Sequence, residues 1–195
     1  MIDDEKQLRG SGPIYKSIRV LELHMSELAS SEITIREARP EDSSAIATIL
    51  HELGWFEHIN HEPLTLTQAQ VAERIRQCYT EKQHTLLVAE RAQRGVVGYV
   101  AVHWFVSLLR GNEGYVSELF LHPAETGRGI GGRLLDSVNE YALERGCTRL
   151  MLMNRRIRES YRRGFYTKHG WQESQDGAFF TLTLSRKSEP AQMAG

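Results

Sequence analysis

Glycine is concentrated in one short segment, where Gly127, Gly129, Gly131 and Gly132 fall within six consecutive positions. The segment follows an apolar run that ends at Leu121 and precedes an amphipathic run, so it is expected to connect a strand to a helix. Because glycine carries no side chain, backbone N–H groups at the start of that helix can converge on phosphate or pyrophosphate. We therefore predict an anion-binding turn. The alternative is a flexible turn whose glycines serve only to reverse the chain.

The spacing Gly127-x-Gly129-x-x-Gly132 formally matches the dinucleotide-binding fingerprint. In that fingerprint the first glycine follows the strand almost directly, and an acidic residue for the ribose comes about 20 residues later. Here residues 122–126 intervene, and the next apolar run ends at Asn154. A dinucleotide-dependent oxidoreductase is therefore the less favoured reading. A nucleoside-triphosphate loop is excluded, because no Gly-Lys-Ser/Thr follows.

Two segments resemble motifs of the GNAT superfamily of N-acetyltransferases. The frame Thr126-Gly127-Arg128-Gly129-Ile130-Gly131 resembles the cofactor-binding motif Arg/Gln-x-x-Gly-x-Gly/Ala, and the segment 164–171 is similar to Phe-Tyr-x-Lys-x-Gly-Phe. The resemblance implies an α/β fold whose mixed, mostly antiparallel central sheet is flanked by helices. It also implies direct acetyl transfer from acetyl-CoA to a primary amine of an unidentified acceptor, a small molecule or a protein or peptide. A non-catalytic acyl-CoA-binding module is the alternative.

The resemblance also assigns the residues that contact acetyl-CoA, whereas no metal ligand is expected. The backbone of Leu119, Phe120 and Leu121 would pair with the pantetheine arm, and Gly127, Arg128, Gly129, Ile130, Gly131 and Gly132 would surround the pyrophosphate. Asn154 completes the cofactor-binding set. Two departures weaken the match: Thr126 replaces the family's Arg/Gln, and Glu159 stands where the family often has a cofactor-binding Asn.

Tyr166 and Glu118 are the predicted catalytic residues. By its position in the second motif, Tyr166 is the candidate general acid for the departing thiolate, because a tyrosine with a pKa of about 10 stays protonated at neutral pH. Its alternative role is packing beside Phe165. Glu118 is the candidate base for the amine, either in a wet cleft or, alternatively, as a surface residue that pairs with a neighbouring strand. Asn154 lies where some relatives have a carboxylate, and an amide cannot act as a base.

The acceptor is expected near two connections rich in aromatic and histidine residues. Aromatic and acidic groups there could bind a cationic amine, although ordinary packing is the alternative. The residues concerned are Trp55, Phe56, His58, His61, Glu62, His103, Trp104 and Phe105.

Apolar periodicity predicts strands that alternate with helices. Strands are expected over 33–36, 85–90, 96–105, 115–121, 149–153 (buried) and 179–184, with a hairpin turn over 92–95 and a loop over 54–64. Helices are expected from Pro40 to about Leu53, from a cap at Thr65 or Thr67 to about Tyr79, over 131–145 and over 159–169.

Length and composition restrict the class of protein. The chain has 195 residues, of which 41% are hydrophobic and 25% charged, and its net charge is −1. This balance of basic and acidic side chains disfavours nucleic acid as a partner. No apolar run is long enough to span a membrane, so no membrane partner is expected. With two cysteines and a polar first segment, the protein is expected in the cytoplasm, as a possible homodimer by the same resemblance. Residues 1–31 are read as an N-terminal extension, 32–185 as the acetyltransferase domain and 186–195 as a flexible C-terminal tail.

Overall fold

The computed structural model describes residues 32–182. The predicted extension over 1–31 and the predicted tail over 186–195 lie outside the described residues. A boundary between Met153 and Asn154 divides the chain into two compact units. The assignment of 32–185 to one acetyltransferase domain stays a prediction.

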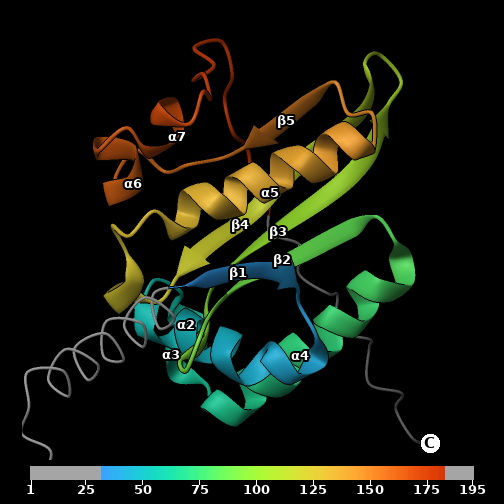
Figure 1. Cartoon of the computed structure of the whole chain (residues 1–195). Helices are drawn as coiled ribbons and strands as arrows, with labels where there is room; N and C mark the ends of the chain where they lie inside the picture. Colours follow the sequence, from blue (N-terminus) through green and yellow to red (C-terminus); the bar gives the residue numbers. More distant parts are fainter. Residues whose placement is uncertain (1–31, 183–195) are drawn as a thin grey trace, which may run out of the picture. The chain divides into compact units, whose positions relative to one another are not determined.

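The first unit contains a five-stranded sheet in the order β1-β2-β3-β4-β5 (Figure 1). The first three pairings along this order are antiparallel, and β4 pairs with β5 in parallel, as the predicted mixed, mostly antiparallel sheet requires. The strands are β1 (Ile33–Glu37), β2 (His84–Arg91), β3 (Gly95–Ser107), β4 (Gly111–Leu121) and β5 (Arg149–Leu152).

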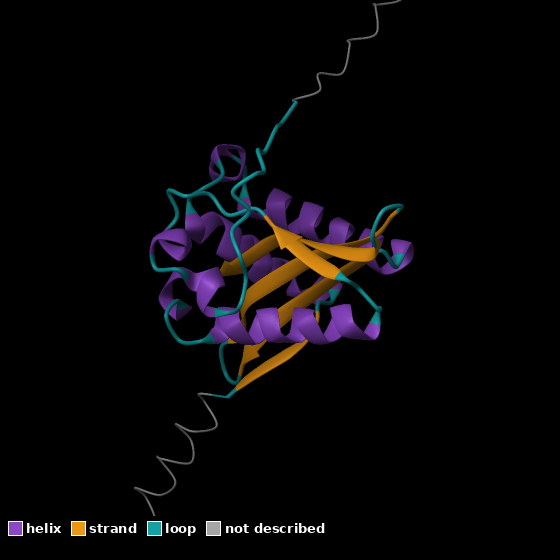
Figure 2. Cartoon of the chain, turned by 90° about the horizontal axis from the view of Figure 1, so that it is seen from above, coloured by secondary structure: helices purple, strands orange, loops and turns teal. Residues whose placement is uncertain are grey.

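Helices cover both faces of this sheet (Figures 1 and 2). On one face, α2 (Ser43–Leu53) and α4 (Leu64–Glu81) enclose a core that includes Ile49, Val88 and Tyr99. On the other face lies α5 (Ile130–Glu144), whose apolar stripe of Leu134, Leu135 and Val138 is fully buried. The two faces follow from the alternation of side chains along the strands.

Several predicted boundaries in the first unit are wrong for local reasons. The helix expected to start at a threonine cap begins instead at Leu64 after Pro63, because proline's fixed φ suits an extended residue just before a helix. The predicted loop contains the short helix α3 (Glu57–His61). The strand expected to be buried, β5, is half-exposed, since it lies at the edge of the sheet.

In the second unit, the predicted helix over 159–169 is divided. It forms α6 (Glu159–Arg162) and α7 (Phe165–Lys168), separated by Gly164 with a φ of +63°. A residue in this left-handed conformation ends one helical turn before the next begins. The last predicted strand, 179–184, is wrong over residues 179–182, which form no strand and expose Phe180. Its remaining residues lie outside the described range.

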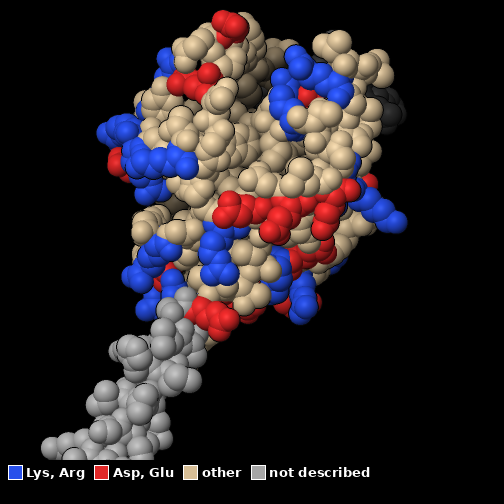
Figure 3. All heavy atoms as spheres, turned by 45° about the horizontal axis from the view of Figure 1, so that its top comes forward, with Lys and Arg blue, Asp and Glu red and all other residues tan. Residues whose placement is uncertain are grey.

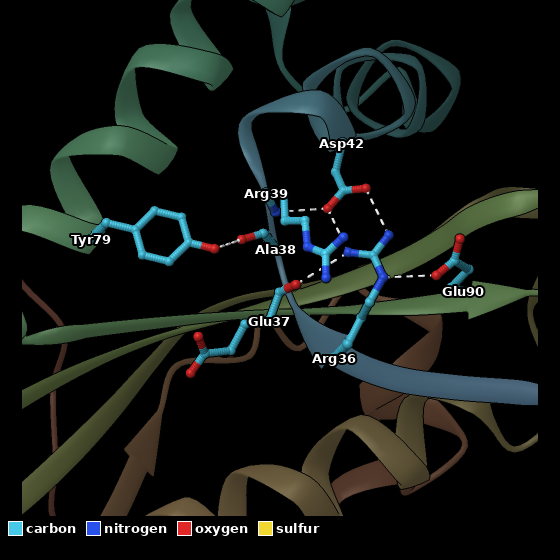
Figure 4. Close-up of polar contacts among 7 residues, drawn as sticks. All are labelled: Arg36, Glu37, Ala38, Arg39, Asp42, Tyr79 and Glu90. Carbon is cyan, nitrogen blue, oxygen red and sulfur yellow. Dashed lines mark hydrogen bonds and ion pairs between the residues drawn. The ribbon is translucent and has the colours of Figure 1, made fainter.

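A polar network fixes the end of β1 (Figure 4). The guanidinium of Arg36 contacts both carboxylate oxygens of Asp42, at 2.8 and 2.9 Å, and its Nε lies 2.7 Å from Glu90 of β2. Asp42 also accepts a hydrogen bond from the backbone N–H of Arg39. Burial alone would raise the pKa of Asp42, but the hydrogen bond from Arg36 holds it below its ordinary value.

Candidate functional site

β4 continues beyond the end of its pairing with β5. β3 pairs with β4 as far as Leu121, whereas pairing with β5 ends at Val116. Within the described sheet, residues 117–121 therefore have a strand neighbour only on the β3 side. An open strand edge offers backbone N–H and C=O groups with which an extended ligand can pair. The segment contains the predicted pantetheine contacts Leu119, Phe120 and Leu121.

The glycine turn follows β4 after a 3-10 helix, η2 (Pro123–Glu125). Gly127 and Gly129 have φ values of +76° and +78°, a left-handed conformation that other residues adopt only at a cost. A Cβ atom at either glycine would meet nothing within 4 Å. Both glycines are therefore needed for the path of the backbone rather than for close packing.

The turn ends at the N-terminus of α5, where Gly129 is the N-cap. The N–H of Arg133 bonds to the carbonyl of Gly129, and the N–H groups before it precede the helical ladder. Ile130, Gly131 and Gly132, which carry these groups, are all buried, and the Ile130 side chain packs into the core. A helix N-terminus of this kind suits an anion, and the anion-binding turn stays a prediction.

Glu118 lies on the open segment of β4 and accepts a 2.6 Å hydrogen bond from the hydroxyl of Tyr99. Tyr99, on β3, is 2% exposed, whereas Glu118 is exposed. Burial and the adjacent carboxylate raise the pKa of Tyr99 well above its ordinary value, so the hydroxyl remains a donor. The Glu118 side chain thus contacts the neighbouring strand and stays accessible. Sequence reasoning missed Tyr99, because partners on adjacent strands depend on the register.

A β-bulge precedes Glu118, since Ala101 and Val102 of β3 face Glu118 and Val116 and leave Ser117 between them. The hydroxyl of Ser117 lies 2.9 Å from Nε2 of His103 on β3. Burial and the neighbouring His84 lower the pKa of His103, although Glu118 acts in the opposite direction. A second group that is neutral at physiological pH therefore lies beside the proposed base.

Phe120 brings part of the predicted acceptor region to β4. Its ring makes edge contacts with Tyr99, Phe56 and Trp55, with centroids 5.8, 5.5 and 5.9 Å away. Because Glu118 and Phe120 are two positions apart on the strand, their side chains lie on the same face of the sheet, as predicted. Among the other predicted acceptor residues, His58 lies against Phe56, and His103 lies against Ser117. Glu62 instead accepts a hydrogen bond from Thr67, and Trp104 is buried.

Glu125, which the sequence did not single out, is a buried carboxylate immediately before the glycine turn. It is 2% exposed, and it lies 2.8 Å from Arg91 and from Arg94 and 3.7 Å from Nε of Arg128. Burial alone would raise its pKa, but the hydrogen bond and charge of Arg91, with Arg94 and Arg128, hold it below the ordinary value. The nearest signal in the sequence is that Arg94 lies within the predicted hairpin turn over 92–95 and Arg91 directly before it.

Tyr166 belongs to α7 in the second unit. Its ring lies against Phe165 and Trp171, with centroids 4.9 and 6.2 Å apart. Burial raises the pKa of Tyr166 to about 12. The hydroxyl therefore keeps its proton at neutral pH but is a weaker acid than an ordinary tyrosine. The packing beside Phe165 is present, and the catalytic role stays a prediction.

Asn154 has a donor that remains unused within its unit. Its Oδ1 accepts a hydrogen bond from Ser160 at 3.2 Å, whereas its Nδ2 is buried without a hydrogen-bond partner among the described residues. A buried amide donor of this kind is costly unless a ligand or water accepts from it. Asn154 therefore fits a ligand rich in carbonyl oxygens, such as the pantetheine arm. In the same unit, Arg156 forms an ion pair with Glu173 at 2.7 Å.

Residues 32–182 contain neither a grouping of metal-binding side chains nor a membrane-spanning helix. No three His, Cys, Asp or Glu side chains in that range are grouped so that they could hold a metal ion. None of the helices in the same range has the length and apolar character needed to cross a membrane.

Comparison with known proteins gives consistent matches. The sequence model of the Acetyltransferase (GNAT) family matches residues 48–171. A thialysine N-epsilon-acetyltransferase from Bos taurus is 27% identical over 140 residues, which cover 67% of this chain and 81% of the relative. A solved structure described as a transcriptional regulator from Bacillus halodurans C-125 superimposes with a TM-score of 0.65 at 23% identity, covering 77% of this chain and 100% of that one.

The structure of glucosamine-6-phosphate N-acetyltransferase from Arabidopsis thaliana has a TM-score of 0.61 at 16% identity, with 81% of this chain and 99% of that chain covered. At such identities the two structural matches establish the fold alone. The family match spans more than half of the chain, and it includes β4, the glycine turn and Tyr166. This chain therefore belongs to the GNAT family of acetyltransferases.

Proposed function

We propose that this protein transfers the acetyl group of acetyl-CoA to a primary amine. The arrangement of residues 117–132 carries the proposal, because an open strand edge leads into a left-handed glycine turn and then a helix N-terminus. The open edge suits the extended arm of a thioester, and the N–H groups suit its pyrophosphate. Membership in the acetyltransferase family supports the same reaction.

The chemistry requires a neutral amine that attacks the thioester carbonyl carbon. Glu118 is the proposed base, directly or through one water, because it is an exposed carboxylate on the strand edge. Backbone N–H groups of 119–121 are proposed to stabilise the oxyanion. When the C–S bond breaks, the thiolate needs a donor. Since the pKa of Tyr166 is about 12 and that of a thiol about 8.5, hydrogen bonding by Tyr166 is favoured over full proton transfer.

The proposed acceptor is a small aliphatic primary amine. Such an amine is cationic before it reacts, and the rings of Trp55, Phe56 and Phe120 lie on the same side of β4 as the Glu118 carboxylate. The Bos taurus relative is described as acting on thialysine. Thialysine and lysine are therefore the first acceptors to test, and peptides with a free N-terminus or lysine are the second.

An acceptor screen tests the proposal. Acetyl-CoA is incubated with thialysine, lysine, glucosamine 6-phosphate and lysine-containing peptides, and release of free thiol is followed. We expect turnover with at least one amine, a 10- to 100-fold lower kcat for Glu118→Gln and about a tenfold lower kcat for Tyr166→Phe. The control is Glu140→Gln, which changes an exposed glutamate on α5 and should leave kcat unaltered.

The outcomes distinguish three functions. Binding of CoA without acetylation of any amine would favour a non-catalytic acyl-CoA-binding module. Full activity of both Glu118→Gln and Tyr166→Phe would contradict the assigned roles but keep the reaction. A protein that binds no CoA would overturn the proposed function.

A further inference from the structure

The carboxylate of Glu125 has no part in the proposed chemistry, yet it is among the most deeply buried charged groups of the first unit. A carboxylate removed from water is costly unless cations and hydrogen bonds compensate it. Arg91 and Arg94 provide this compensation, both at 2.8 Å, and they come from the end of β2 and the following turn. The contacts connect the β2–β3 turn to η2, which leads directly into the glycine turn.

The third partner of Glu125 lies inside the glycine turn itself. Nε of Arg128 is 3.7 Å from Oε2 of Glu125, and the Arg128 side chain is 57% exposed. In the sequence between His122 and Gly132, Arg128 is the sole lysine or arginine, and Thr126 occupies the position that is Arg or Gln in the resembled motif. Arg128 is therefore the side chain within the turn that can contribute positive charge to a bound phosphate.

We propose that Glu125 is a positioning residue for the binding of acetyl-CoA: its carboxylate holds the Arg128 side chain in the conformation that contacts the pyrophosphate. This assignment rests on the proposed function. A guanidinium has five N–H donors, so contact through Nε leaves others to meet a phosphate. Glu125 thereby reduces the loss of side-chain entropy when the ligand binds.

An opposing effect must be weighed, because the negative charge of Glu125 also repels phosphate. Three guanidinium groups surround the single carboxylate, so the cluster as a whole keeps a positive charge. Arg91 and Arg94, both 2.8 Å from the carboxylate, offset its negative charge before it can act on a bound phosphate. We therefore expect the ordering of Arg128 to outweigh the repulsion. Loss of Glu125 should weaken CoA binding rather than strengthen it.

A double-mutant cycle measured by calorimetric titration of CoA into the full-length protein tests the proposal. Glu125→Gln and Arg128→Ala are each expected to raise the Kd for CoA by about fivefold. If Glu125 acts through Arg128, the double variant should bind CoA no more weakly than Arg128→Ala alone. Arg94→Ala removes a largely exposed partner of Glu125 and should raise the Kd for CoA by about twofold. This variant tests the proposal even if Glu125→Gln does not fold.

Glu113→Gln is the matched control. Glu113 is also 2% exposed and lies 2.7 Å from Nε of Arg149, but it is near the start of β4, whereas the glycine turn follows the end of that strand. Its replacement should lower the melting temperature about as much as Glu125→Gln while the Kd for CoA stays the same. A purely structural role of Glu125 would give the same behaviour for both variants.

Three results would overturn the assignment. The first is unchanged or tighter CoA binding by Glu125→Gln or by Arg128→Ala. The second is independent, additive effects of the two substitutions, since Glu125 would then not act through Arg128. The third is a wild-type protein that binds no CoA, which would overturn the proposed function as well; the first two leave that function intact.

Discussion

Glu118 and Tyr166 owe their chemical properties to opposite environments. The Glu118 carboxylate is exposed, and the buried hydroxyl of Tyr99 fixes one of its oxygens at 2.6 Å. Tyr166 is partly buried, and burial raises its pKa to about 12. An exposed carboxylate is accessible to an amine or to water, whereas a partly buried phenol of high pKa acts as a hydrogen-bond donor. These properties support the division of roles in the proposed reaction.

At the residue scale, Tyr99→Phe should lower kcat by about three- to tenfold, because Glu118 loses the donor that fixes its orientation. The KM for acetyl-CoA should stay constant, since Tyr99 faces the α2–α4 core rather than the glycine turn. Steady-state kinetics with the best amine provides the measurement. Tyr141→Phe is the control, because it removes a hydroxyl 3.2 Å from Glu37 and should leave kcat unchanged. An unaltered kcat in Tyr99→Phe would contradict this role.

At the scale of elements, β4, η2 and α5 form a continuous path from the strand edge to a helix N-terminus. The path depends on backbone conformation, since Gly127 and Gly129 are both left-handed and have free space where a side chain would stand. The chain can therefore turn sharply and direct the first N–H groups of α5 toward one point. A side chain at either position would clash with no neighbouring atom. It would disturb ligand binding because it disfavours the left-handed backbone conformation.

Gly129→Ala should cost about 1 kcal/mol of folding free energy and raise the Kd for CoA several-fold, because alanine disfavours a φ of +78°. Denaturant unfolding and calorimetric titration give the two quantities. Gly111→Ala is the matched control, since Gly111 has a φ of +83° and equal free space but starts β4, at the other end of the strand. It should lose similar stability and bind CoA normally. Equal Kd changes in both variants would refute a local effect of the turn.

At the scale of the whole molecule, charge is balanced but locally organised. On the face drawn in Figure 3, basic side chains of the described residues form separate groups among acidic ones rather than a continuous field. The cluster around Glu125 and the Arg36–Asp42–Glu90 network each place several charges in contact. Anion binding can thus be confined to the glycine turn although the net charge is only −1.

The network at Asp42 predicts how stability depends on pH. The folded-state pKa of Asp42 lies below its ordinary value of 3.8, so the contribution of Asp42 to stability is fully present above pH 3.8 and is lost as the pH falls through the folded-state pKa. Asp42→Asn should therefore cost about 1–2 kcal/mol at pH 7 and progressively less below pH 3.8. Urea unfolding at pH 7 and at pH 3 measures both values. If the free energies of unfolding of the wild type and of Asp42→Asn differ by the same amount at both pH values, the proposed link to the titration of Asp42 is contradicted.

Periodicity in the sequence was sufficient to predict most elements of the first unit. The strands at Ile33, in the 85–105 hairpin and in β4 were found, because alternating apolar residues identify half-buried strands. The break at Gly164 and the missing strand over 179–182 were not predicted. A short apolar run such as Phe179 to Leu182 forms a strand only when another strand pairs with it, and local sequence does not specify that partner.

The sequence by itself determined the family, the mixed sheet and the position of the glycine turn, since these depend on local spacing and backbone conformation. The tertiary structure decided which side chains meet. Tyr99 reaches Glu118 through the register of β3 and β4, and Arg91 and Arg94 reach Glu125 across more than 30 positions of sequence. Contacts between distant segments are set by packing and register, which no single stretch of sequence encodes.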